Sequence, residues 1–259
     1  MKLKLIAAAA LLAATGAANA AIDNGSGGNG ELFFSAWDGA SSYTFDLNTT
    51  IDAFQASVNA VGTGTYVNAT LDALFTTYLS TANLSTLVWN IVATDLSGAR
   101  RIVNTYTTLP ATTMGGPEGR SAAGTVGAFV TAVNQGITAQ GGVNSAVFAA
   151  GTNGYANVAS GTTFGDNIGG LLNFSNGGTV ANNSYANGLG LMRVDVPPSG
   201  SGVSTYNPYV DGGFSVRSYF DTTSGTVTIS AVPEPETYAM LLAGLGLMGA
   251  IARRRRNQA

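Results

Sequence analysis

Residues 87–108 read LVWNIVATDLSGARRIVNTYTT, and this stretch decides the class of fold. Apolar residues take alternate positions in its first part: Leu87, Trp89, Ile91 and Ala93. A period of two is typical of a β-strand, because successive side chains point to opposite faces. Residues 95–98 end in a glycine and predict a turn, and residues 101–108 predict the return strand. The stretch therefore indicates an antiparallel hairpin in a mainly β protein.

The same pattern recurs on both sides of this hairpin. Residues 32–37 and 43–47 flank a short polar turn, and apolar residues alternate with polar ones in the second segment. We therefore expect a hairpin with one buried face there. A further strand is expected over residues 191–196, and a last hairpin over residues 214–221 and 226–232.

Two segments have apolar residues at helical spacing instead. An amphipathic helix is expected over residues 65–82, and a second one over residues 121–135 with Gly136 as its stop. Residues 138–190 are rich in Gly, Ala, Asn, Ser and Thr, which is typical of short strands with many turns or of long surface loops. Together these patterns predict a single domain that is mainly β, sandwich-like, and carries two amphipathic helices.

The charged residues between the two ends of the chain exclude several classes of function. Residues 21–232 contain twelve acidic residues and five basic ones: Arg100, Arg101, Arg120, Arg193 and Arg217. The resulting net charge of −7 argues against nucleic-acid binding, which needs a basic surface. The same residues contain no Lys, His or Cys. This excludes the Ser-His-Asp triad, cysteine nucleophiles, the usual zinc and haem ligands, disulfides and Schiff-base chemistry, and no cofactor is expected.

Chemistry that uses only carboxylates survives these exclusions. Glycoside hydrolysis needs two Asp or Glu side chains. Candidates for such a pair are Glu31, Asp38, Asp95 and Glu118. Calcium needs only oxygen ligands, and the acidic segments 46–52 and 166–167 are the candidates for it. Neither segment follows a recognised calcium loop, so we interpret both as solvated turns and predict no metal site.

Two further features suggest ligands at first sight. Residues 25–30 read GSGGNG, which matches the dinucleotide-binding fingerprint, but no predicted strand precedes them and no predicted helix follows. We interpret this segment as a flexible stretch. Trp37 and Trp89 offer the aromatic surface that stacks against sugar rings. Both lie in alternating strands, which favours a place in the core over a sugar-stacking site.

The N-terminal residues are typical of an export signal. Residues 1–4 include two lysines, residues 5–14 are apolar, and Ala18-Asn19-Ala20 provides the small residues of a cleavage site. The apolar run is too short for a transmembrane helix. Residues 1–20 are therefore predicted to be a signal peptide that the export translocon reads and that is removed before Ala21.

The C-terminal residues combine three features in a fixed order. They are the box Val232-Pro233-Glu234-Pro235, an apolar run over 238–252, and the cluster Arg253, Arg254, Arg255 and Arg256. A helix of this apolar run is about 22 Å long, short of the ~30 Å hydrocarbon core, but the arginines can snorkel to the headgroups. We therefore expect a single transmembrane helix, with the arginines in the cytoplasm and the domain outside. The prolines bias Glu234 toward an extended conformation, which suits recognition by a protease.

The export signal, followed by a domain and then by this box, helix and arginine cluster, resembles a bacterial PEP-CTERM protein. The resemblance implies a Gram-negative bacterium that produces exopolysaccharide, with an exosortase in its inner membrane that recognises Pro233, Glu234 and Pro235. It also implies that the helix is removed and that the domain is released to the cell surface or matrix. The organisation expected is a signal peptide over 1–20, a β-rich exported domain over 21–231 and a sorting segment over 232–259.

The tag implies sorting and no particular activity, so the exported domain needs a hypothesis of its own. We favour a noncatalytic surface or matrix protein that associates with exopolysaccharide or biofilm. A carboxylate-dependent glycan hydrolase and a carbohydrate-binding adhesin remain as alternatives. Turnover of a glycan would identify the enzyme, and the adhesin predicts polysaccharide or self-association of the purified domain in a pull-down.

Overall fold

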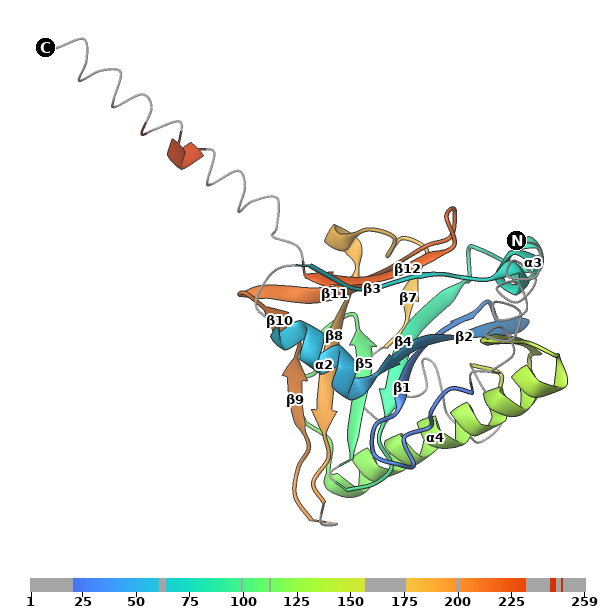
Figure 1. The fold of residues 1–259 in the computed structure, drawn as a ribbon, viewed down its shortest axis with the longest axis horizontal. Coiled ribbons are helices and arrows are strands. Elements are labelled where there is room, and N and C mark those ends of the chain that lie inside the picture. Colours follow the sequence, from blue (N-terminus) through green and yellow to red (C-terminus); the bar gives the residue numbers. More distant parts are fainter. Residues whose placement is uncertain are drawn as a thin grey trace, which may run out of the picture.

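The computed structural model describes residues 21–60, 64–98, 100–111, 113–156, 176–198, 201–231, 243–245 and 248. These residues form a twelve-stranded antiparallel sheet with three α-helices (Figure 1). The strands are β1 (Glu31–Trp37), β2 (Ser41–Thr50), β3 (Gly64–Thr70), β4 (Val88–Thr94), β5 (Arg101–Tyr106), β6 (Ser145–Ala149), β7 (Gly178–Thr179), β8 (Leu189–Asp195), β9 (Thr205–Pro208), β10 (Val210–Asp211), β11 (Phe214–Asp221) and β12 (Thr226–Ala231). The helices are α2 (Ile51–Asn59), α3 (Ala73–Thr81) and α4 (Gly116–Ala139), with a short 3₁₀ turn, η1 (Tyr185–Asn187).

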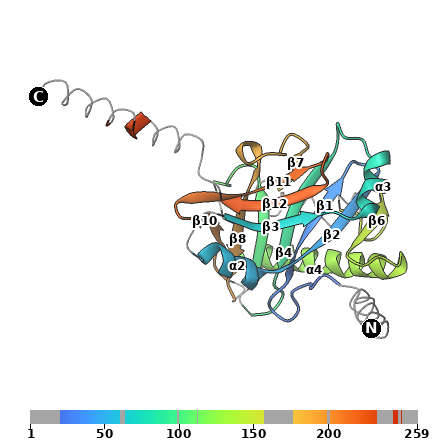
Figure 2. The ribbon, with the colours of Figure 1, turned by 45° about the horizontal axis from the view of Figure 1, so that its top comes forward.

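The sheet is continuous and curls over itself. Its main path runs β3-β12-β11-β8-β5-β4-β1-β2-β6, with β7, β9 and β10 paired at the side. Phe220 of β11 contacts Phe34 of β1 and Trp89 of β4, with ring centroids 4.8 and 5.9 Å apart, although three strands separate β11 from β1. Figure 2 shows β3, β12 and β11 crossing over the strands of the other half. The mainly β prediction is confirmed, but one curled sheet replaces the two packed sheets that a sandwich implies.

The inside of the curl holds one hydrophobic core. Side chains from β1, β2, β4, β8, β11 and β12 fill it, and α2 and α3 close the gap between the two ends of the sheet. Asp72 fixes α3 in this gap: its side chain accepts hydrogen bonds from the N–H groups of Leu74 and Phe75, as an N-cap does. It also accepts one from the Tyr43 hydroxyl of β2 at 3.0 Å and one from Ser145 of β6 at 2.5 Å.

A second core lies on the outer face of the sheet, under α4 (Figure 1). Phe33 of β1 meets Phe129 of α4 with ring centroids 5.7 Å apart. Because both faces of β1 and β2 are covered, residues 32–37 and 42–47 are all buried. The prediction that this hairpin has one buried face is therefore wrong: alternating polar residues such as Ser35 and Thr44, hydrogen-bonded at 2.9 Å, lie beneath α4.

The predicted helix over 65–82 is wrong in its first half. Residues Gly64–Thr70 form β3, which pairs with β12, and the helix begins only after Asp72. The β-branched residues of this segment, such as Val67, favour a strand, and the edge of the sheet offers their backbone a partner. Helix α4 begins before the predicted residue 121, and Gly136 lies inside it where a larger side chain would meet the ring of Phe148.

Helix α2 was not predicted, although its sequence contains the signals. Thr50 caps it by accepting the N–H of Ala53 at 3.3 Å, and the buried residues Ile51, Phe54 and Val58 lie on one stripe.

The predicted hairpins β1–β2, β4–β5 and β11–β12 and the strand β8 are confirmed. The Gly- and Asn-rich segment 138–190 contains the short strands β6 and β7, and its residues 157–175 lie outside the described part of the chain.

The two predicted terminal signals lie outside the described residues. Residues 1–20 are not described, nor is the segment 232–259 apart from 243–245 and 248, which are helical. In the portion of the chain that the structure covers, no helix combines the length and apolarity needed to cross a membrane.

Candidate functional site at the mouth of the curled sheet

Charged side chains gather at one end of the curled sheet, beside α2. There β4 ends before Asp95, β5 begins at Arg101, and β8 ends with Arg193 and Asp195. The pairing of Arg101 with Asp195 brings these ends together. Arg101 and Arg193 continue the inward-facing positions of Val103 and Leu191, so they project from the inner face of the sheet. We call this end, with its charged residues and α2, the mouth.

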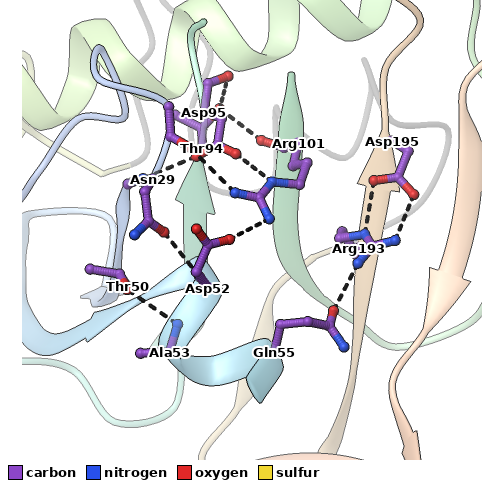
Figure 3. Close-up of polar contacts among 12 residues, drawn as sticks. Asn29, Thr50, Asp52, Ala53, Gln55, Thr94, Asp95, Arg101, Arg193 and Asp195 are labelled. Atoms are coloured by element: carbon purple, nitrogen blue, oxygen red, sulfur yellow. Dashed lines mark hydrogen bonds and ion pairs between the residues drawn. The ribbon is translucent and has the colours of Figure 1, made fainter. Parts of the chain in front are cut away.

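Arg101 connects three parts of the mouth. Figure 3 shows its guanidinium between Asp95 and Asp52, with Nε 2.5 Å from Asp95 Oδ2 and Nη1 2.7 Å from Asp52 Oδ1. The side chain of Asp95 is 2% exposed, whereas that of Asp52 is 60% exposed. Burial acts to lower the pKa of Arg101, but the hydrogen bonds that it donates to both aspartates outweigh burial and raise the pKa. Arg101 therefore stays charged and neutralises a buried carboxylate.

The segment 25–30 is a packed turn of the mouth, and its interpretation as a flexible stretch is wrong. The carbonyl of Gly25 accepts the N–H of Leu96 at 2.8 Å, and the N–H of Gly30 donates to Asp95 Oδ1 at 3.0 Å. A Cβ at Gly30 would lie 2.1 Å from the backbone oxygen of Thr94. Glycine is therefore required here for close approach of two backbones. The turn also caps α2, because Asn29 Oδ1 accepts the N–H of Asp52 at 3.0 Å.

Arg193 organises a second part of the mouth. Its Nε and Nη2 donate to the two oxygens of Asp195 at 2.8 and 2.9 Å, and its Nη1 donates to Gln55 Oε1 of α2 at 2.8 Å (Figure 3). Gln55 in turn donates to Asn59 Oδ1 at 2.9 Å, and Asn207 of β9 donates to Asp195 Oδ2 at 2.8 Å. Five planar polar side chains are thus held in one hydrogen-bonded chain across α2, β8 and β9.

This chain forms one wall of an open pocket of about 220 Å³. Val58, Pro208, Tyr209 and Val210 supply its apolar surface. Tyr209 is buried, its ring contacts Phe54 at a centroid distance of 4.9 Å, and its hydroxyl has no hydrogen-bond partner. Burial raises the pKa of Tyr209 to about 12, although Arg193 and Arg101 act to lower it. The phenol is therefore neutral and able to donate or accept a hydrogen bond.

Trp37 and Trp89, the candidates for sugar stacking, are core residues. They are 2% and 0% exposed, and the indole N–H of Trp89 donates to the carbonyl of Thr179 at 3.0 Å. Trp37 lies in the core under α4, and Trp89 lies inside the curl. Neither ring presents a face to a ligand in this structure, so the alternative that they stack against sugars is not supported by their position.

The four candidate carboxylates for glycoside hydrolysis each bind the protein itself. Glu31 Oε2 accepts the N–H of Asp23 at 2.8 Å, and Glu118 Oε2 accepts the N–H of Gly115 at 3.0 Å at the start of α4. Asp95 pairs with Arg101 as described. Asp38 lies beyond the other end of β1 and accepts the N–H groups of Ala40, Ser41 and Asn83. Partial burial acts to raise the pKa of Asp38, but these hydrogen bonds lower it overall.

The acidic segment 46–52 does not converge on one point. Asp52 points to Arg101, whereas Asp46 is fully buried on the face of β2 that α4 covers. Burial raises the pKa of Asp46 to about 7, with nearby Glu31 adding to the rise and the N–H of Asn48 opposing it. Among the described residues no group of three or more Asp or Glu side chains lies close enough to hold a metal ion. The other calcium candidate, residues 166–167, lies outside those residues.

Sequence reasoning did not identify the mouth. A usable signal was present in Arg193 and Asp195, two positions apart on a strand and therefore on one face, among only five arginines in residues 21–232. Gln55 of α2 lies far from Arg193 in the sequence, and only the curl of the sheet brings it there. Asn207 reaches the same place by the local pairing of β9 with β8.

The sorting segment follows directly from the sheet. Ala231, the last residue of β12, is buried and pairs with Gly64 of β3 and Val216 of β11. The sequence-predicted sorting residues Val232, Pro233, Glu234 and Pro235 and the arginines 253–256 lie outside the described residues, as do Ala18 and Ala20.

Comparison with known families identifies this segment. Residues 231–256 match the family described as the PEP-CTERM protein-sorting motif. The chain matches none of the curated proteins and none of the solved structures with which it was compared. The motif is a substrate signal for exosortase, a membrane protein, and directs export and cell-surface sorting in Gram-negative bacteria. The chain therefore carries a PEP-CTERM protein-sorting motif over residues 231–256.

Proposed function

We propose that this chain is a noncatalytic protein of the cell surface or extracellular matrix that associates with exopolysaccharide. The observation that carries the proposal is the position of the sorting motif, which begins at the last residue of β12. Every described strand lies before the Pro-Glu-Pro box, so removal of the residues after it would leave the sheet and both cores complete. The domain is thus suited to persist outside the cell after exosortase has acted.

The composition supports the noncatalytic part of the proposal. Residues 21–232 lack Lys, His and Cys, so a catalytic role would rest on carboxylates. The four carboxylates considered for that role have structural partners: backbone N–H groups for Glu31, Asp38 and Glu118, and Arg101 together with Gly30 for Asp95. We therefore place the glycan hydrolase second.

The proposed route begins with export through the translocon, directed by residues 1–20. The apolar helix over 238–252 would then hold the chain in the inner membrane, with Arg253–Arg256 in the cytoplasm and the domain in the periplasm. Exosortase would recognise Pro233, Glu234 and Pro235 and release the domain to the surface or matrix. A net charge of −7 over residues 21–232 argues against nucleic acid as a binding partner.

Sedimentation with the exopolysaccharide of the native host tests the association. The protein recovered from the host matrix should co-sediment with the purified polysaccharide. The chain length of the polysaccharide should stay unchanged over many hours. A soluble control of similar charge should remain in the supernatant. Failure to co-sediment would remove the proposed partner, and a progressive release of reducing ends would replace the proposal with the hydrolase.

A further inference from the structure

We propose that the pocket beside Arg193 binds one ring of a neutral sugar; the inference deepens the proposed function by naming the site and the ligand class. The pocket lies at the mouth, where α2 meets β8, β9 and β10. Its volume of about 220 Å³ is below the roughly 300–1,000 Å³ of pockets for drug-sized ligands. A single ring fits this space better than a longer segment of a chain does.

The charge of the pocket favours a neutral ligand. The guanidinium of Arg193 lies between 2.8 and 2.9 Å from both oxygens of Asp195, so the two charges cancel within the wall. Asp52 and Asp95 add negative charge at the same end of the sheet, where Arg101 is the other cation of the mouth. An anionic sugar such as a uronate would meet this excess of carboxylates, whereas hydroxyl groups would not be repelled.

The hydrogen-bonding groups of the pocket match a polyol. Three of the five N–H bonds of Arg193 are directed to Asp195 and Gln55, which leaves one on Nη1 and one on Nη2. Asn59 Nδ2 is a further donor, and Asn207 Oδ1 is an acceptor. A sugar hydroxyl both donates and accepts, so it can use this mixture better than a ligand with acceptors alone.

The apolar part of the pocket suits the ring of a sugar. Tyr209 lines the pocket, although its hydroxyl oxygen is buried. The remaining wall, formed by Val58, Pro208 and Val210, offers an apolar surface for the C–H face of the ring.

The wall is also held in place before a ligand arrives. Gln55 and Asp195 fix the plane of Arg193, and Asp195 fixes Asn207. Little side-chain entropy remains to be lost on binding, which favours even a small ligand.

Isothermal titration of the full chain tests this inference, in micelles of a detergent without a sugar headgroup. The probes are D-glucose, D-galactose, D-mannose and D-glucuronate. At least one neutral hexose should bind with a Kd in the millimolar range or tighter, and glucuronate should bind more weakly than the corresponding hexose. In Val210→Trp, which fills the pocket from a half-exposed position, Kd should rise at least tenfold. Val203→Trp is the matched control, because Val203 is exposed outside the pocket and its variant should bind as the wild type does.

Arg193→Lys provides a second variant that keeps the charge and removes the planar fork, and it should also weaken binding about tenfold. Absence of binding for all three hexoses, unchanged affinity in Val210→Trp, or tighter binding of glucuronate would overturn the inference. Co-sedimentation of Val210→Trp with the host polysaccharide separates the two proposals. If that variant still co-sediments fully, the pocket is not the binding site but the association stands; if hexoses bind while the wild type fails to co-sediment, the pocket stands and the proposed partner is wrong.

Discussion

At the scale of single residues, the mouth depends on glycines that allow two backbones to touch. The turn 25–30 packs against the end of β4, and Gly30 approaches Thr94 so closely that a Cβ would lie 2.1 Å from its oxygen. Gly27, in the same turn, has nothing within 4 Å of the position that a Cβ would take. One turn therefore contains a glycine that the packing requires and another that it does not.

Gly30 and Gly27 should therefore differ in how well they tolerate a larger side chain. Gly30→Ala should lower the free energy of unfolding by at least about 2 kcal/mol, because the turn must move away from β4 and weaken the bond from Gly30 to Asp95. Gly27→Ala should change it by less than about 0.5 kcal/mol. Urea denaturation followed by tryptophan fluorescence measures both, and equal stability of the two variants would contradict the close approach.

Asp46 makes a pH-dependent contribution to stability. Its side chain is buried under α4, Oδ2 has no hydrogen-bond partner, and its pKa is raised to about 7 by burial. A folded-state pKa above the unfolded value means that the folded protein binds the proton more tightly. The contribution of protonated Asp46 to the free energy of unfolding is therefore complete below about pH 4, and it is lost as the pH rises through about 7.

The second prediction follows from this sign. Between pH 4 and pH 8, ionisation of Asp46 should lower the free energy of unfolding of the wild type by up to about 4 kcal/mol. Asp46→Asn has no such group to ionise, so the variant should be more stable than the wild type at pH 8. Asp221→Asn is a control, because Asp221, at the end of β11, has a pKa that hydrogen bonds from Ser224 and Thr223 lower. Urea titrations at several pH values measure the effect. A wild type and an Asp46→Asn variant with parallel pH profiles would refute it.

At the scale of elements, Arg101 joins α2 to the ends of β4 and β5. It bonds Asp52 in the first turn of α2, Asp95 after β4, and the carbonyl of Gly28 at 3.4 Å. The two ion pairs differ in burial, and this difference decides their energetic importance. A buried carboxylate that loses its partner remains charged in a poor solvent, whereas an exposed one is hydrated.

The third prediction uses this contrast. Arg101→Ala should lower the free energy of unfolding by about 3–5 kcal/mol, because it leaves Asp95 buried without its cation. Asp52→Ala removes only the exposed partner and should cost less than about 1 kcal/mol. The double variant Arg101→Ala/Asp95→Ala should recover part of the loss. If Asp52→Ala proved as damaging as Arg101→Ala, the loss would come from the docking of α2 and not from the buried charge.

The sequence predicted elements well where the partner of a strand is its neighbour in the chain. The hairpins β1–β2, β4–β5 and β11–β12 are of this kind, since each turn and its alternation lie within about twenty residues. Strand β3 was predicted as helix because its partner β12 lies more than 150 residues away and the apolar spacing continues into α3. The pocket was beyond prediction for the same reason, because Gln55 lies 138 residues before Arg193 and reaches it only in the fold.

At the scale of the whole molecule, the end of the sheet and the start of the sorting motif coincide. Ala231 is both the last residue of β12 and the first residue of the matched motif. Apart from Ala231, the residues of the sheet and those of the matched motif are therefore separate in sequence. Cleavage in or after the Pro-Glu-Pro box would leave β12 paired on both sides, with β3 and with β11.

Mass spectrometry of the C-terminal peptide tests this account most directly. The protein should be recovered separately from the membranes and from the extracellular matrix of its native host. We predict a matrix form that ends between residues 232 and 236 and lacks residues 238–259, together with a minor membrane form that keeps them. An intact C-terminus in the matrix, or a protein found only in membranes with residues 238–259 attached, would contradict release by exosortase.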